Sequence, residues 1–132
     1  MRAQAAMEYL SIVGIILVFI IPIWAYLITV EQETASELSL SYSKNAVRQI
    51  ADASSLVYSQ GPPAKISFQI YVPPGVNSIS FDNKSVVFNV SLGAVYTDVF
   101  ATSTAAMNGT LPKDEGYYTV EITAIDGFVQ IN

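Results

Sequence analysis

An uncharged apolar run near the N-terminus constrains this chain more than any other feature. Residues 9–30 carry no charge, and most of them are aliphatic or aromatic. A helix needs about 20 such residues to cross the roughly 30 Å hydrocarbon core of a bilayer, so the run predicts a membrane-length helix. Glu8 is a charged residue directly before this run. A carboxylate in lipid is costly unless it reaches the interface or a partner charge.

The apolar run could also belong to a secretory signal peptide or to a plain single-pass anchor. A secretory signal peptide has an apolar stretch of about 7–15 residues followed by a small-x-small cleavage site. Here the run is longer and ends in the bulky sequence Ile23-Trp24-Ala25-Tyr26-Leu27. A plain single-pass anchor is compatible with the sequence. In either case Arg2 precedes the run while Glu31, Glu33 and Glu37 follow it, so we expect the N-terminus in the cytoplasm and the remainder outside.

The segment Gln4-Ala5-Ala6-Met7-Glu8-Tyr9-Leu10 resembles the start of archaeal type IV pilin-like proteins with a class III signal peptide. In that family a short leader ends before a Gln, and a Glu follows four residues later, as Glu8 follows Gln4. The resemblance implies that a prepilin peptidase cuts between Ala3 and Gln4. It also implies that the pilus assembly machinery then packs the mature helices into a homo-oligomeric filament. The family often has Ser at the third mature position, where this chain has Ala6, and the likeness ends near Val30.

Glu8 also has a physical interpretation. After cleavage, Gln4 would carry a free ammonium that could lie near Glu8 of a neighbouring subunit. A buried pair of opposite charges is tolerated, whereas an isolated buried charge is strongly disfavoured. Such a pair would help to select the register of the subunits. The alternative is that Arg2 and Glu8 only mark the cytoplasmic boundary of an ordinary anchor.

Two residues inside the run bear on helix packing. Gly14 would let another helix approach closely in an apolar setting. Pro22 removes one backbone hydrogen bond and crowds the carbonyl of Val18, which predicts a kink or local loosening. Both are also compatible with an ordinary anchor.

Helical periodicity continues beyond the membrane. An apolar stripe recurs at spacings of three or four residues and predicts a helix to about Tyr58 that docks on the following domain. Its members are Leu38, Tyr42, Ala46, Ile50, Ala53 and Val57. Lys44, Arg48 and Asp52 lie off the stripe and should be solvated. The segment Ser59-Gln60-Gly61-Pro62-Pro63 should end the helix, because Gly suits the position after a helix and Pro cannot continue one.

From Lys65 onward the period changes to two, which predicts strands. Residues 66–72 form the first. Residues 78–81 and 85–91 flank a turn at Asp82-Asn83-Lys84, residues 94–101 follow Gly93, and residues 117–124 and 128–131 flank Asp126-Gly127, a strong hairpin signal. Residues 101–114 show the least pattern and predict an exposed loop. About six short antiparallel strands indicate a small sheet or sandwich.

The composition argues against several classes of function. The net charge of −5 argues against nucleic acid, which requires a basic patch. Cysteine and histidine are absent, which removes thiolate metal sites and the commonest general base. Asp114 and Glu115 are adjacent carboxylates, but turn chemistry explains them. We therefore expect no catalytic residues, no metal site and no cofactor.

The outer part offers few other sites. Asn83, Asn89 and Asn108 each begin an Asn-x-Ser/Thr triplet and could carry N-linked glycans, with ordinary surface asparagines as the alternative. Asn83 and Asn108 should be accessible. The outer tyrosines Tyr96, Tyr117 and Tyr118 could stack on a glycan or a surface, although core or strand-pairing roles suit most of them.

These observations predict an α+β chain with a long N-terminal helix, consisting of a membrane stem and an amphipathic stalk, and a small antiparallel β-sheet or sandwich head. The expected divisions are a leader at 1–3, a transmembrane or filament-core helix at 4–30, a stalk at 31–60 and an extracytoplasmic head at 61–132. The expected function is that of a pilin in an archaeal surface filament, with a role in adhesion. The rival is a membrane-anchored accessory or substrate-binding protein with a pilin-type signal that does not polymerise; an anchored enzyme comes third.

Overall fold

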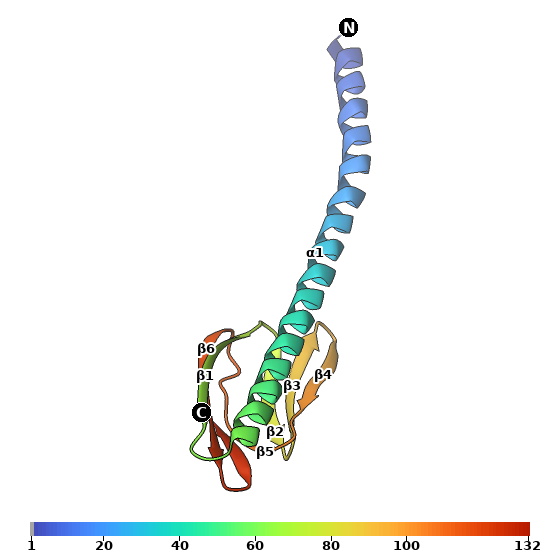
Figure 1. Cartoon of the computed structure of the whole chain (residues 1–132). Coiled ribbons are helices and arrows are strands. Elements are labelled where there is room, and N and C mark those ends of the chain that lie inside the picture. The colour runs from blue at the N-terminus through green and yellow to red at the C-terminus, as the bar shows by residue number, and fades with distance from the viewer. Residues whose placement is uncertain (1) are drawn as a thin grey trace. The chain divides into compact units, whose positions relative to one another are not determined.

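One helix precedes all the strands in the computed structural model, which describes residues 2–132 (Figure 1). Met1, the first residue of the expected leader, and the side chain of Arg2 lie outside the described part. The elements are α1 (Arg2–Gln60), β1 (Lys65–Val72), β2 (Val76–Asp82), β3 (Ser85–Leu92), β4 (Val95–Thr102), β5 (Ala106–Gly109), β6 (Gly116–Ile125) and β7 (Phe128–Ile131). The expected α+β class is therefore confirmed.

The chain divides into two compact units, residues 1–35 and residues 36–132. The described part of the first unit is the N-terminal portion of α1. The second unit holds the C-terminal portion of α1 together with all the described strands. Residues 36–60, most of the expected stalk at 31–60, thus belong to the same unit as the head.

The helix ends where the sequence predicts. Its last residue is Gln60, and Gly61 adopts a left-handed conformation with φ of 72°. The Gly61 amide donates to the carbonyl of Tyr58 at 3.1 Å, and the Ala64 amide donates to the carbonyl of Gly61 at 2.9 Å. A left-handed glycine after the last turn lets the chain reverse while the final carbonyls keep partners.

The buried face of α1 in the second unit differs in part from the predicted stripe. Ala46, Ile50 and Val57 are buried as expected, whereas Leu38 and Tyr42 are about half exposed. The buried face turns instead toward small side chains that the apolar pattern left out. These small residues are Ser39, Ser43, Ala51 and Ser54. Val47 is buried on the same face. A search for large apolar residues does not detect buried serines and alanines, so the sequence pattern placed the buried face differently.

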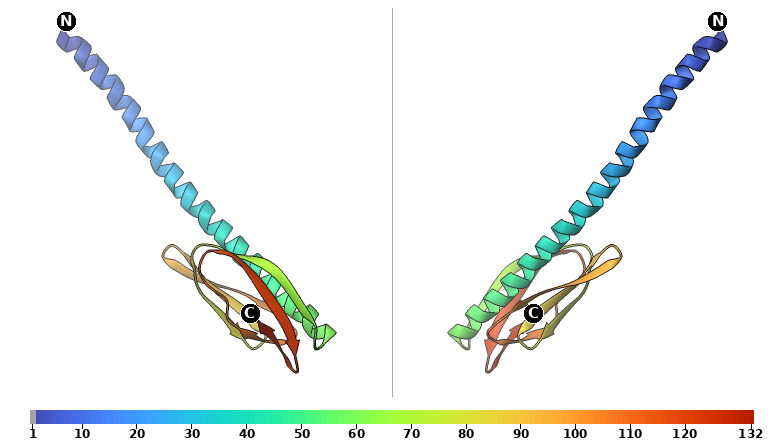
Figure 2. Two further views of the ribbon diagram at one scale, coloured as in Figure 1. Left: turned by 90° about the vertical axis from the view of Figure 1, so that its left-hand side faces the viewer. Right: turned by 90° about the vertical axis from the view of Figure 1, so that its right-hand side faces the viewer.

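The described strands form two sheets. The first has four strands in the order β1-β6-β7-β5, and the second has three in the order β2-β3-β4. Both predicted hairpins are present: Asn83, with φ of 50°, lies in the turn between β2 and β3, and Gly127, with φ of 87°, lies in the turn between β6 and β7. In the second unit β1 and β6 run along one flank of α1, and β3 and β4 run along the other (Figures 1 and 2).

The expected exposed loop at residues 101–114 is wrong in part. Residues 106–109 form β5, which pairs in parallel with β7, so the head is not wholly antiparallel. Ser103, Ala105 and Met107 are buried, and the Met107 amide donates to the carbonyl of Asn83 at 2.6 Å. A four-residue strand is too short to display a period, and its position depends on partners that are distant in sequence.

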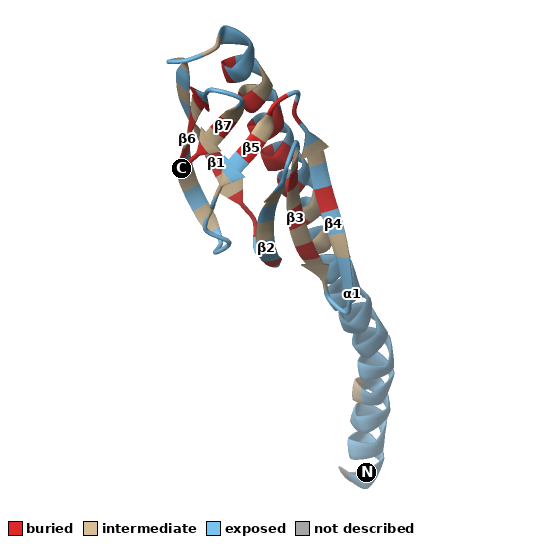
Figure 3. Ribbon diagram, turned by 90° about the horizontal axis from the view of Figure 1, so that it is seen from below, coloured by how far each residue is buried: buried red, intermediate tan, exposed pale blue. Residues whose placement is uncertain are grey.

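One hydrophobic cluster unites α1 and both sheets. Its largest fully buried side chain is Phe88 of β3, and Val86 and Val90 share the same buried face, as the alternation predicts. Ile50 of α1 and Ile122 of β6 belong to the same cluster. Buried residues of α1 gather on the side toward the strands (Figure 3).

Ile50→Ala tests this docking. Ile50 is fully buried, so the substitution should lower the free energy of unfolding by about 2–5 kcal/mol through lost burial and a residual cavity. The measurement is denaturant unfolding of the full chain in detergent micelles, with Leu56→Ala as the matched control, because Leu56 is 49% exposed on the same helix. Equal destabilisation by the two substitutions would contradict the docking.

Candidate functional site

The N-terminal portion of α1 presents an apolar surface with no cover from the chain itself. Among residues 3–30 every residue is exposed except Val13, which is half-buried (Figure 3). α1 is the one described helix that is long and apolar enough to cross a membrane, and its most apolar stretch is wholly unburied. Since exposed apolar area of this extent is unfavourable in water, lipid or protein has to cover it.

The two aliphatic hydroxyl groups in this segment are satisfied inside the helix. The Ser11 hydroxyl donates to the carbonyl of Met7 at 2.8 Å, and the Thr29 hydroxyl donates to the carbonyl of Ala25 at 3.1 Å. Such bonds let hydroxyl groups enter an apolar environment at low cost. α1 continues through Pro22 without interruption.

Aromatic side chains occur toward both ends of the apolar run. Tyr9 lies near one end, and Trp24 and Tyr26 lie toward the other, all three exposed. At 1.5 Å per residue, Tyr9 and Tyr26 are separated by about 26 Å along the helix. Tyrosine and tryptophan favour the two interfaces of a membrane, and this separation is close to the thickness of the apolar core.

Glu8 is the charged group that the helix does not satisfy. It makes no hydrogen bond or ion pair with any described side chain from residue 3 to residue 132. Gln4 lies one helical turn before Glu8, so the two share a face of α1. Gly14 also lies on this exposed segment, and nothing lies within 4 Å of the position that a Cβ would take there.

The three candidate glycosylation asparagines have different surroundings. Asn83 and Asn108 are exposed, in the β2–β3 turn and on β5. Asn89 is half-buried on β3, and its Nδ2 donates to Oδ1 of Asp98 at 2.6 Å. Asn77 in turn donates to Oδ1 of Asn89 at 3.3 Å. Because a glycan is attached through the side-chain nitrogen, Asn83 and Asn108 are better placed to accept one.

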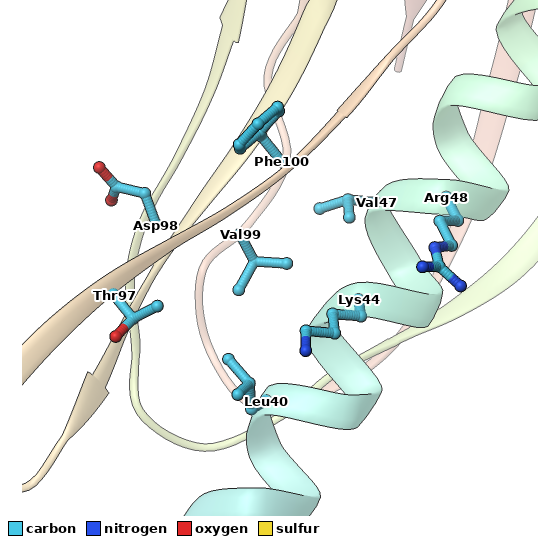
Figure 4. A pocket seen from close by; sticks show the side chains of 8 residues that line it. All are labelled: Leu40, Lys44, Val47, Arg48, Thr97, Asp98, Val99 and Phe100. Carbon is cyan, nitrogen blue, oxygen red and sulfur yellow. The ribbon is translucent and has the colours of Figure 1, made fainter.

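A groove runs between α1 and β4, the edge strand of the three-stranded sheet (Figure 4). Its volume is about 260 Å³. Val99 points toward the helix, whereas Asp98 and Phe100 point away from it (Figure 4). Lys44 and Arg48 of α1 line the groove and are exposed, as expected for residues off the stripe.

A second opening, the tyrosine cleft, lies where α1 passes β1 and β6. Tyr71 of β1 and Tyr117 of β6 are cross-strand partners whose ring centroids lie 4.9 Å apart. Tyr42 of α1 meets Tyr71 edge-on, with centroids 5.2 Å apart and an interplanar angle of 81°. These rings line an open cleft of about 260 Å³ together with the amide side chains of Asn45, Gln49 and Gln69.

Of the tyrosines singled out in the sequence, Tyr117 lies in this cleft, Tyr96 is exposed elsewhere on β4, and Tyr118 packs against the core. Tyr42 and Tyr71 were missed as site residues. Tyr42 belonged to a predicted core stripe, and Tyr71 alternated with apolar residues of its strand. No sequence signal placed them beside each other, because they come from elements joined only by the fold.

The hydroxyl of Tyr71 is held in its neutral form. It donates a hydrogen bond to Oε1 of Glu115 at 3.1 Å. Burial raises the pKa of Tyr71 above its ordinary value of 10.0, and the hydrogen bond and negative charge of Glu115 raise that pKa further. The phenol therefore stays uncharged to a higher pH than a free tyrosine does.

No protein-family model, curated protein or solved structure matches the chain.

Glu115→Gln should lower the pKa of Tyr71 toward 10.0 without reaching it, because the charge is removed while burial, the largest cause, remains. The measurement is a pH titration of the tyrosine ring-carbon resonances of the full chain in micelles, with Tyr71 assigned from a Tyr71→Phe sample. Asp114→Asn is the matched control, since this neighbouring carboxylate makes no bond to Tyr71. Identical titrations of Tyr71 in the native chain and in Glu115→Gln would refute the contribution of Glu115.

Proposed function

We propose that this chain is a pilin-like structural subunit that polymerises through the N-terminal portion of α1. A peptidase on the cytoplasmic side removes residues 1–3, between Ala3 and Gln4. The helix serves first as a single-pass membrane anchor with the head outside, and then as the core of an archaeal surface filament. The observation that carries the proposal is an unburied apolar helix whose charged group at the edge, Glu8, has no partner among the side chains of residues 3–132.

Glu8 supports polymerisation over simple anchoring. Lipid offers helices no hydrophobic reason to associate, so small residues and polar groups decide which helices pair. Cleavage before Gln4 creates an ammonium, and a neighbouring subunit would bring that ammonium to Glu8. The pair would neutralise both charges in the filament core and set the axial register. Gly14 leaves room for the backbone of a second helix, because no described atom lies within 4 Å of the position that a Cβ would take there.

The head would form the outer surface of the filament. Its single core includes the C-terminal portion of α1, so each subunit would carry a folded head built on its own helix. Asn83 and Asn108 would then face outward as acceptors of N-linked glycans, and adhesion would depend on exposed residues of the strands. The partners are copies of this chain, the prepilin peptidase and the assembly machinery.

A second function, an anchored binding protein that does not polymerise, is favoured by one observation. The tyrosine cleft is an open site on the head, and its lining comes from a single copy of the chain, so a ligand could bind there without polymerisation. Sedimentation separates the two: a filament subunit is recovered as a long polymer after shearing of cells, whereas an anchored monomer stays with the membrane fraction.

Glu8→Ala tests the proposed role directly. Expressed in the native host, the variant should reach the membrane at normal levels and yield few or no sheared filaments. The reason is that removing one partner of a buried charge pair leaves the other uncompensated, at a cost of about 3–5 kcal/mol. The measurement is the ratio of chain in the sheared filament fraction to chain in the membrane.

Glu33→Ala is the matched control, because Glu33 is an exposed carboxylate of the same helix beyond the apolar run. It should leave the ratio unchanged. Normal filaments from Glu8→Ala, or an equal loss in both variants, would rule out a specific role for Glu8 in assembly.

A further inference from the structure

The tyrosine cleft combines aromatic rings with unbonded amide groups. Asn45, Gln49 and Gln69 are exposed, and within residues 2–132 none of their side chains makes a hydrogen bond. Each amide therefore offers a donor and an acceptor to a ligand. Tyr117 is 70% exposed, so most of its ring surface is also available.

We propose that the tyrosine cleft binds a neutral saccharide. The faces of Tyr117 and Tyr42 would stack against the C–H face of a sugar ring, because an aromatic face is negative and the C–H hydrogens are weakly positive. The amides of Asn45, Gln49 and Gln69 would hydrogen-bond to its hydroxyl groups, which both donate and accept.

The polar lining of the cleft favours an uncharged ligand. Its polar residues are tyrosines and amides, with no lysine, arginine, aspartate or glutamate among them. A phosphate, a sulfate or a carboxylate would find no cation in it, and charged ligands are recognised mainly by such groups. The Tyr71 hydroxyl, engaged by Glu115, is also neutral at physiological pH.

A quaternary ammonium is the main competing ligand, since aromatic cages bind such cations. A cage leaves a gap between ring faces for the cation. Here Tyr71 touches both of its neighbours, with centroids 5.2 Å from Tyr42 and 4.9 Å from Tyr117. The three rings therefore leave no gap between them for a cation. Their outward surface is better suited to the flat face of a sugar than to a cation.

The size of the cleft limits the ligand to a small group. Pockets for drug-sized ligands measure about 300–1,000 Å³, and this cleft of about 260 Å³ lies just below that range. One sugar ring of a longer saccharide would fit a cleft of this size, with the neighbouring sugar rings in solvent. Weak binding at one such site becomes strong when many copies act together.

This inference goes beyond the proposed function and does not require polymerisation. Every residue of the cleft belongs to the second unit, residues 36–132. The chain carrying Glu8→Ala should therefore bind the same saccharide as the native chain, whether or not filaments form.

Saturation-transfer NMR on the full chain in detergent micelles tests the proposal. The neutral probes are lactose, cellobiose and chitobiose, and the charged probes are glucose 6-phosphate, glucuronate and choline. At least one neutral probe should receive saturation through its C–H face. Tyr117→Ala and Gln69→Ala should each weaken binding of that probe by about tenfold, as expected for the loss of one stacked ring or one hydrogen-bonding partner.

Tyr96→Ala is the matched control, because Tyr96 is 67% exposed on β4 and lies outside the cleft. It should leave binding unchanged. Tyr96→Ala and Gln69→Ala should keep the native unfolding temperature because both side chains are exposed, and Tyr117→Ala, which also removes the contact with the Tyr71 ring, is compared with the native chain at a temperature where both are folded. The proposal is overturned by a lack of signal for every neutral probe, by stronger binding of a charged probe, or by an equal effect of Tyr96→Ala and Tyr117→Ala.

Discussion

The apolar side chains of residues 3–30 have to be covered by lipid or by protein, and the choice between a filament subunit and an anchored monomer depends on which of the two covers them. Within the part of the chain that the structure describes, the most apolar stretch of this segment is unburied. The Ser11 and Thr29 hydroxyls bond to the helix backbone, and Glu8 is the charged and therefore the costly group. A bilayer satisfies a carboxylate only near its surface, whereas a neighbouring subunit can supply an opposite charge.

The C-terminal portion of the same helix solves a different packing problem. There large apolar residues share the buried face of the helix with serines and alanines. Ser43 and Ser54 are fully buried, and their hydroxyls have no partner within residues 2–132. Burial of Ile50, Val57 and the other core residues of this part of α1 offsets the cost of these hydroxyls.

Local patterns predicted most of the fold. The end of α1 at Gly61 and the turns at Asn83 and Gly127 depend on residues that are adjacent in the sequence, so the local sequence predicts them. The short strand β5 and the tyrosine cleft could not be predicted in this way, because each is held by partners from distant parts of the chain. Gly109 illustrates this: a Cβ there would lie 2.2 Å from the Ile131 carbonyl oxygen of β7, which explains the glycine only after the strands are paired. The proposed assembly residues Gln4 and Glu8 were recognised from their spacing, and their partners would lie in other molecules.

The most direct test of polymerisation is the N-terminal mass of the chain in filaments sheared from its native cells. We expect the first peptide to begin at Gln4, with the chain present at many copies in each polymer. Recovery of the chain only as a membrane-bound monomer that still begins with residues 1–3 would contradict the central claim.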